Sequence, residues 1–197
     1  MKKMNFVKEM LSISFMFFVM NILVMATELP DNSIYHIDSN WLNHNNNKVN
    51  IASLEGKVQV MAFVYTYCEH SCPIILAKLK YIENNISPEK KDEINFLLIS
   101  LDPKRDTPKV LNDYMKKKEL NENTWQMFSG DPDDVIELSA LIGVRYKPMN
   151  NEEKDIAHSN MISILDKKGR IHYQMKGLDV SLEKVVSEIE AATEIQE

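Results

Sequence analysis

The chain has two cysteines, Cys68 and Cys72, with three residues between them and Pro73 directly after the second. They follow an apolar run of strand length and precede a helical pattern, which is where ligands and catalytic groups gather in open α/β sheets. Pro73 suits the first helical position and favours extended geometry at Cys72, so we expect Cys68 on the loop just before the helix. The partial positive charge of a helix N-terminus favours thiolate over thiol. The two sulfurs are therefore the first candidates for chemistry.

Three uses of the cysteine pair are open. A disulfide across so short a loop stabilises a fold by only about 2 kcal/mol, so a purely structural bridge gains little. Thiol–disulfide exchange needs the pair alone. Two thiolates suit Cu(I), and an added imidazole gives a sulfur and nitrogen set that copper in either oxidation state, or zinc, accepts. Metal binding therefore requires a third ligand.

Five histidines could supply that ligand: His36, His44, His70, His158 and His172. His36 and His44 lie in a polar, Asn-rich stretch, where we expect a hairpin tip at 43–47 and no chemistry. His70 lies between the cysteines, from where an imidazole does not easily reach the ion that both of them hold. We expect an exposed loop side chain there, with a competing or transient ligand as the alternative. Of the five, only His70 and His158 are well placed to reach the cysteines.

The pattern of apolar residues predicts the elements that must position these side chains. We expect strands at 58–65, 94–101, 124–129, 160–165 and 170–175, and helices from 73 onward and at 107–118, 132–142 and 181–192. Extended pieces at 33–42 and 49–54 precede them. Strand and helix alternation followed by a hairpin and a last helix predicts an α/β, thioredoxin-like fold. It comprises a central sheet with helices on both faces and an N-terminal β-hairpin.

In a thioredoxin-like fold, the segment that leads into strand 160–165 faces the cysteine loop. Thioredoxins keep a cis-proline at this place, whereas this chain has no proline after Pro148 and puts His158 there. A histidine favours ligation over disulfide exchange at this point. The sequence therefore predicts Cys68, Cys72 and His158 as metal ligands, with Cys68 and Cys72 as a redox pair in the alternative.

Three segments together resemble the Sco/SenC family, over a span from about Ile34 to the last helix. They are Thr66-Tyr67-Cys68 with Cys72-Pro73, then Leu101-Asp102-Pro103-Lys104-Arg105-Asp106-Thr107-Pro108, then His158-Ser159 leading into 162–169. The resemblance implies a copper protein of cytochrome c oxidase assembly. It implies copper, as Cu(I) or Cu(II), held by Cys68, Cys72 and His158. The implied partners are the copper-accepting subunit of the oxidase and other periplasmic copper carriers.

The sequence departs from that family at Ala157, where relatives commonly have Asp. A carboxylate that would orient the His158 ring is therefore missing. Asp102 and Asp106 match an acidic pair of the family, but a turn residue and a cap at the helix N-terminus are the simpler interpretation.

The N-terminus predicts export. Lys2, Lys3 and Lys8 precede an apolar run at 10–26, and small residues at 24 and 26 fit a cleavage site. A cleaved signal peptide and a retained membrane anchor are both open. We expect residues 27–197 to form one domain in the periplasm, either free or tethered to the inner membrane.

Charge and composition narrow the function. The formal charge is −6, and removal of residues 1–26, which hold three Lys and one Glu, leaves −8, so nucleic acid is not expected as a partner.

From the resemblance and the three candidate ligands, we expect a copper metallochaperone for the binuclear copper site of cytochrome c oxidase, which binds copper without catalytic turnover. An exported thiol–disulfide oxidoreductase that uses Cys68 and Cys72 is the rival, and a copper or redox sensor is also open.

Overall fold

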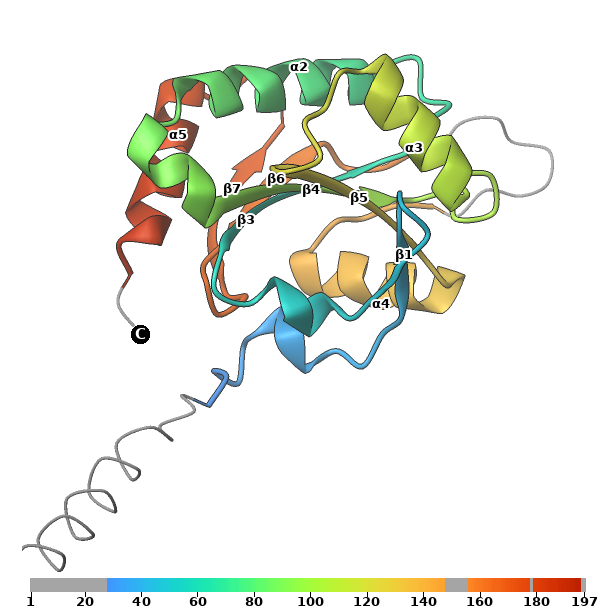
Figure 1. Ribbon diagram of the computed structural model, residues 1–197, viewed down its shortest axis with the longest axis horizontal. Coiled ribbons are helices and arrows are strands. Elements are labelled where there is room, and N and C mark those ends of the chain that lie inside the picture. Colours follow the sequence, from blue (N-terminus) through green and yellow to red (C-terminus); the bar gives the residue numbers. More distant parts are fainter. Residues whose placement is uncertain (1–27, 148–155, 178, 196–197) are drawn as a thin grey trace, which may run out of the picture.

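The computed structural model describes residues 28–147, 156–177 and 179–195, in which a seven-stranded sheet is the central element (Figure 1). Its strands are β1 (Trp41–Asn43), β2 (Lys48–Val49), β3 (Val58–Val64), β4 (Ile94–Ser100), β5 (Trp125–Gly130), β6 (Met161–Leu165) and β7 (Ile171–Lys176). The order in space is β2-β1-β5-β4-β3-β6-β7. The helices are α2 (Ser71–Asn85), α3 (Pro108–Lys117), α4 (Pro132–Ile142) and α5 (Leu182–Thr193), with 3₁₀ turns η1 (Ile34–His36), η2 (Ile51–Leu54) and η3 (Pro88–Glu93).

The two central strands, β3 and β4, are buried along their whole length, as their continuous apolar runs predict. They are parallel and in register from Val58 opposite Ile94 to Val64 opposite Ser100, so both end at the same edge of the sheet. Strand β6 is antiparallel to β3, with Ile162 opposite Ala62. The end of β3, the end of β4 and the beginning of β6 therefore meet at one edge.

Helices cover both faces of the sheet. In Figure 1, α2 and α3 lie over one face and α4 lies under the other, while α5 packs beside α2. Helix α2 turns Ile75, Leu79 and Ile82 into the core at helical spacing. The predicted α/β, thioredoxin-like architecture with helices on both faces is confirmed.

Two local predictions were wrong. The N-terminal hairpin exists as the antiparallel pair β1 and β2, but most of the expected extended pieces at 33–42 and 49–54 are not strands. Ser33 and Asn50 each accept a hydrogen bond from the backbone two residues later, which starts the 3₁₀ turns η1 and η2 instead.

The second correction concerns the start of α2, which is Ser71 rather than Pro73. Cys72 is therefore a helical residue and is not extended. The first N–H groups of a helix have no partner within it, so a proline is tolerated throughout the first turn and not only at its first position.

Among the described residues, no helix has the length and apolar character needed to cross a bilayer. The predicted signal or anchor at 1–26 lies outside the described residues and stays a prediction.

Candidate metal centre

The cysteine loop connects β3 to α2 at the edge where the strands meet. The backbone N–H of Cys68 donates to the carbonyl oxygen of Tyr65 at 3.2 Å, which closes a turn. The N–H of Cys72, in the first turn of α2, donates to the Cys68 sulfur at 3.4 Å. Cys68 is half-buried, Cys72 is buried, and the two thiols are not joined. The Cys68 sulfur thus lies at the N-terminus of α2, where the helix favours negative charge.

His158 lies on a short strand-like segment before β6. It forms an antiparallel bridge with Tyr146, and the backbone N–H of Lys147 donates to Ala157 at 3.0 Å. The Nδ1 atom of His158 is 3.2 Å from the carbonyl oxygen of Ser159. Because a carbonyl can only accept, Nδ1 carries the proton and Nε2 keeps its lone pair.

The lone pair of His158 faces a sulfur atom. Nε2 is 3.9 Å from Sγ of Cys72, although the two residues are 86 positions apart in the sequence. The structure therefore brings all three predicted ligands to one place: Cys68 contacts Cys72, and Cys72 contacts His158.

The two thiols differ in acidity. Burial alone would raise the pKa of Cys68, but hydrogen bonds from the Cys72 side chain, the backbone of Cys72 and His70, and the Tyr65 side chain lower it to about 7. Burial, and then the hydrogen bond to Cys68, raise the pKa of Cys72. Burial also lowers the pKa of His158, against the effect of the Ser159 carbonyl. Near neutral pH the site holds a partly ionised sulfur, a protonated thiol and a neutral imidazole.

Asp106 fastens the cysteine loop to the loop after β4. Its side chain is fully buried and accepts hydrogen bonds from the Thr66 N–H at 3.1 Å, from the Thr66 hydroxyl, and from the Ser100 hydroxyl at 2.6 Å. Burial raises the pKa of this carboxyl against those bonds. The helix cap predicted around Thr107 and Pro108 is present, with Thr107 as the N-cap of α3, whereas the Asp106 side chain is used for these bonds and does not cap the helix.

Asp102 and Tyr67 complete this link. Asp102 forms an ion pair with Arg105, as suits a residue in a turn, and the Arg105 guanidinium lies 5.0 Å from the centre of the Tyr67 ring. The ring of Tyr67 is 56% exposed beside Cys68, so the cation covers part of an otherwise exposed aromatic face.

Tyr65 is a site residue that sequence reasoning missed. It was predicted only as the last residue of a strand, yet its hydroxyl accepts the N–H of Ile156 at 3.3 Å and its ring meets the His158 ring edge-on at 6.1 Å. A signal was present: a buried tyrosine usually gives its hydroxyl a polar partner, whereas phenylalanine needs none.

The other histidines lie apart from this centre or turn away from it. His70 is exposed, and only its backbone N–H contributes to the site, toward Cys68. His36 is 3.0 Å from the Pro30 carbonyl oxygen, and His172 is 3.2 Å from Glu188.

The donor set fits a soft or borderline metal ion. Sulfur and imidazole are the usual ligands of such ions. The other ring nitrogen of a metal-binding histidine commonly donates to a carbonyl or carboxylate, as Nδ1 of His158 does here. Within residues 28–147, 156–177 and 179–195, no three Cys, His, Asp or Glu side chains already stand in coordination geometry. Binding by Cys68, Cys72 and His158 would therefore need small side-chain movements.

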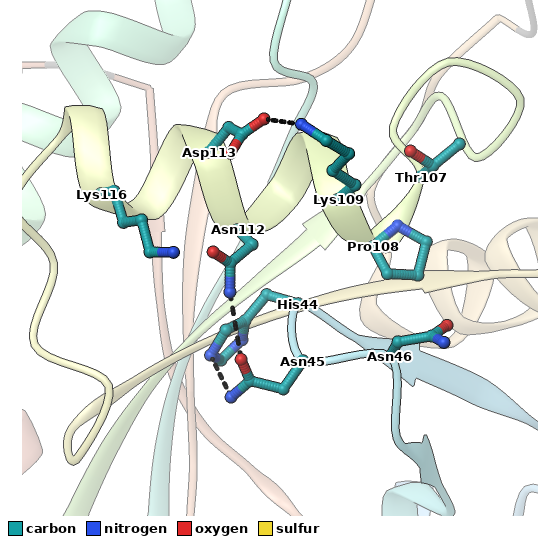
Figure 2. A pocket seen from close by; sticks show the side chains of 9 residues that line it. All are labelled: His44, Asn45, Asn46, Thr107, Pro108, Lys109, Asn112, Asp113 and Lys116. Atoms are coloured by element: carbon teal, nitrogen blue, oxygen red, sulfur yellow. Dashed lines mark hydrogen bonds and ion pairs between the residues drawn. The ribbon is translucent and has the colours of Figure 1, made fainter.

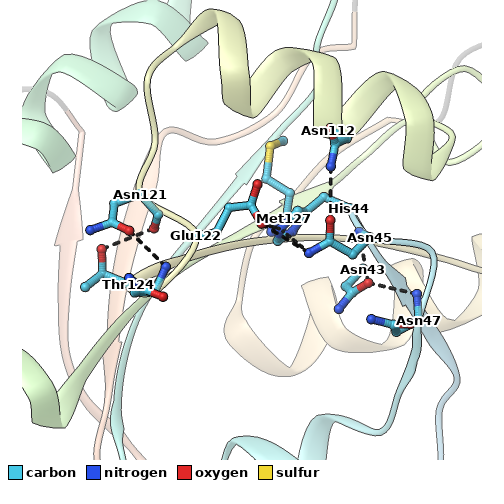
Figure 3. A network of polar contacts seen from close by, with 10 residues as sticks. Asn43, His44, Asn45, Asn47, Asn112, Asn121, Glu122, Thr124 and Met127 are labelled. Carbon is cyan, nitrogen blue, oxygen red and sulfur yellow. Dashed lines mark hydrogen bonds and ion pairs between the residues drawn. The ribbon is translucent and has the colours of Figure 1, made fainter.

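A second polar region surrounds His44, between β1 and α3. A cavity of about 600 Å³ is lined there by His44, Asn45, Asn46, Thr107, Pro108, Lys109, Asn112, Asp113 and Lys116 (Figure 2). His44 is 4% exposed, and its Nδ1 accepts the N–H of Met127 at 3.4 Å. Figure 3 shows the hydrogen-bonded chain from Asn112 through Asn45 to Glu122 beside it. The hairpin tip predicted at 43–47 is present between β1 and β2, with the His44 side chain buried beneath it.

Comparison with known proteins decides the family. The SCO1/SenC family profile matches residues 30–194. The chain belongs to the SCO1/SenC family. A SCO1 protein homolog of Bacillus subtilis (strain 168) is 23% identical over 156 residues, which are 78% of this chain and 80% of the homolog.

Solved structures of SCO1/SenC proteins share the fold. ScoI of Bradyrhizobium japonicum with copper bound aligns with a TM-score of 0.65 and 24% identity, over 78% of this chain and 96% of that one. BsSco, described as a member of the Sco family of cytochrome c oxidase assembly proteins with a disulfide switch, aligns with a TM-score of 0.68 and 20% identity, over 80% and 92%.

Proposed function

We propose that this SCO1/SenC protein is a copper metallochaperone that holds copper through Cys68, Cys72 and His158 and delivers it to the binuclear copper site of cytochrome c oxidase. The observation that carries the proposal is the contact of Cys72 Sγ with an unprotonated His158 nitrogen at 3.9 Å, beside a second sulfur of lowered pKa.

The chemistry of the donors supports copper. Thiolates favour Cu(I), and the added imidazole makes the set acceptable to Cu(II) as well. Relatives of the same fold are described with copper bound and as cytochrome c oxidase assembly proteins. The partner we propose is the copper-accepting subunit of the oxidase, with other periplasmic copper carriers as sources of the ion.

Export would place the site where copper is handled outside the cytoplasm. The basic start and apolar run at residues 10–26 support export, with the domain free in the periplasm or tethered to the inner membrane. A reporter active only after export, fused to residues 1–30, tests this. A silent reporter with the protein in the cytosol would contradict it.

The direct test is copper binding by the full chain, purified in a mild detergent, reduced and offered one equivalent of Cu(I) or Cu(II) against a weak chelator. Cys68→Ser and Cys72→Ser should each abolish binding. His158→Ala should weaken it by about tenfold or more, since two sulfurs alone leave Cu(II) under-coordinated. His70→Ala, the matched control, should keep full stoichiometry. If the wild-type chain holds neither ion, the proposal is wrong.

A second candidate is thiol–disulfide exchange, favoured by the pairing of an acidic Cys68 with a buried, protonated Cys72. The Cys68 thiolate would attack a partner disulfide and release one partner thiolate. The Cys72 thiol would give its proton to the released partner thiolate and attack the Cys68 sulfur of the mixed disulfide, which releases the second partner thiolate. A Cys68–Cys72 disulfide and a reduced partner would remain.

His158 separates the two candidates. Exchange depends on the two sulfurs and on access, so His158→Ala should retain exchange with a test disulfide while it loses copper. A variant that loses exchange and keeps copper would reverse the assignment.

A further inference from the structure

Tyr65 connects the two halves of the candidate site, which are far apart in the sequence. The residue is 3% exposed and directly follows β3. Its hydroxyl accepts the backbone N–H of Ile156 at 3.3 Å, two residues before His158. The Tyr65 side chain is also among the groups that lower the pKa of Cys68. A phenol oxygen accepts hydrogen bonds through its lone pairs, so this hydroxyl can hold the backbone of the His158 segment from the end of β3.

The ring of Tyr65 adds a contact with the ligand itself. It meets the His158 imidazole at 6.1 Å between centroids and at 79°, an edge-on arrangement that fixes the direction of both rings. Tyr65 therefore contacts the His158 segment twice, through its hydroxyl at Ile156 and through its ring at His158.

Apart from the contact of Nε2 with Cys72 Sγ, the other restraints on His158 in the described part of the chain come from its own side of the site. Nδ1 donates to the adjacent residue, Ser159, and Ala157 has no carboxylate to offer. The backbone bonds of this segment run to Arg145 and Lys147, which are not part of the cysteine loop. A direct tie from the cysteine loop to the His158 segment is what the Tyr65 hydroxyl supplies.

We propose that the Tyr65 hydroxyl is a positioning group that sets the placement of His158 relative to Cys68, and through it the affinity of the site for copper. The inference rests on the function proposed above. A phenylalanine would keep the ring contact with His158 and lose the tie to Ile156, so the hydroxyl can be tested by itself.

The test compares Tyr65→Phe with wild type, His158→Ala and the double variant, each as full chain in mild detergent and titrated with Cu(II) against a chelator. Tyr65→Phe should weaken Cu(II) binding by about tenfold, as loss of a group that orients a ligand does, and change the Cu(II) electron paramagnetic resonance spectrum. In the His158→Ala background, Tyr65→Phe should have little effect on copper binding, because the imidazole that the hydroxyl positions is no longer present.

A matched control is Tyr146→Phe. Tyr146 is paired with His158 in the backbone bridge, but its hydroxyl has no hydrogen-bond partner in the described part of the chain. It should bind copper as wild type does. In the metal-free protein, the Ile156 amide should exchange its hydrogen faster in Tyr65→Phe and at the wild-type rate in Tyr146→Phe.

The outcomes separate cleanly. If wild type binds copper through His158 and Tyr65→Phe matches it, the inference alone is overturned. Equal weakening with and without His158 also overturns it, because a general loss of structure would act that way. If wild type holds no copper, the proposed function is wrong and the inference falls with it.

Discussion

His158 and His44 are both largely enclosed by protein, and burial lowers the pKa of each ring, yet they use their nitrogens in opposite ways. His44 accepts a backbone N–H at Nδ1, and its Nε2 lies 3.1 Å from the Asn45 amide and 3.8 Å from Glu122. His158 donates from Nδ1, and its Nε2 faces a sulfur.

The difference shows what would distinguish a metal-binding histidine from a structural one. The direction of the pKa shift does not separate these two histidines. Deep burial does not mark a ligand either, because His44 is the more buried of the two, and the cavity of about 600 Å³ lies beside His44, not beside the thiols. The nitrogen that carries the proton separates them. In His44 both nitrogens have polar partners within the protein, so the ring joins β1 to β5. In His158, Nε2 faces the Cys72 sulfur and would be free to bind the metal ion proposed there.

The comparison predicts that alanine at the two histidines has opposite effects on copper binding and on stability. The loss of copper binding in the His158 variant is the largest effect expected. His158→Ala should weaken copper binding by about tenfold or more and lower the free energy of unfolding by less than about 1 kcal/mol. His44→Ala should leave copper binding unchanged and cost about 1–3 kcal/mol, because it strands the buried Met127 N–H. Copper titration and urea unfolding of both variants measure the two quantities, and loss of copper in His44→Ala would refute the distinction.

The sequence could predict the ligand edge because its signals are local or periodic. Continuous apolar runs identified β3 and β4, and parallel strands must end at the same edge, which placed Cys68 and Cys72 there. His158 followed from the fold and from the residue type at the start of β6.

The features of the site that the sequence did not predict depend on contacts between residues far apart in the chain. The spacing of apolar residues gives no information about such contacts. The bonds of Asp106 to Thr66 and of Tyr65 to Ile156 join segments 40 and 91 positions apart. The burial of His44 likewise comes from β5, since its polar neighbours 43–47 suggested a solvated turn. The capping side chains of Ser33 and Asn50 decided the short turns that were predicted as extended.

The two thiols of the site can be compared in the same way as the two histidines. A sulfur that is accessible and ionised, as a metal ligand must be, should also react readily as a nucleophile. In the reduced, metal-free protein, alkylation of Cys68 should accelerate as the pH rises through about 7 and then level off. Cys72, buried and with a raised pKa, should react much more slowly throughout. Peptide mapping by mass spectrometry after timed iodoacetamide treatment distinguishes the sulfurs, and equal rates would contradict the assigned acidity.

The smallest expected effect is a loss of folding stability at acid pH, to which both His44 and His158 contribute. Burial lowers the folded-state pKa of His44 and of His158 below the unfolded value of about 6.5, so below that pH the unfolded chain binds more protons than the folded one. Their stabilising contribution is therefore full above about pH 6.5 and is lost as the pH falls toward the folded pKa. Each ring can contribute a slope of at most about 1.4 kcal/mol per pH unit.

Urea unfolding of the metal-free protein between about pH 7.5 and about pH 5.5 measures this slope. His44→Gln and His158→Gln should each flatten it, because glutamine does not titrate in this range. The Glu122 carboxylate opposes the shift at His44, and the Ser159 carbonyl opposes it at His158, so neither ring is expected to dominate. A slope that stays the same in His44→Gln would mean that the folded protein accommodates a charged ring beside Glu122. His44 would then form an ion pair with Glu122 when it is protonated. The two histidines would differ only in which ring nitrogen carries the proton in the neutral form.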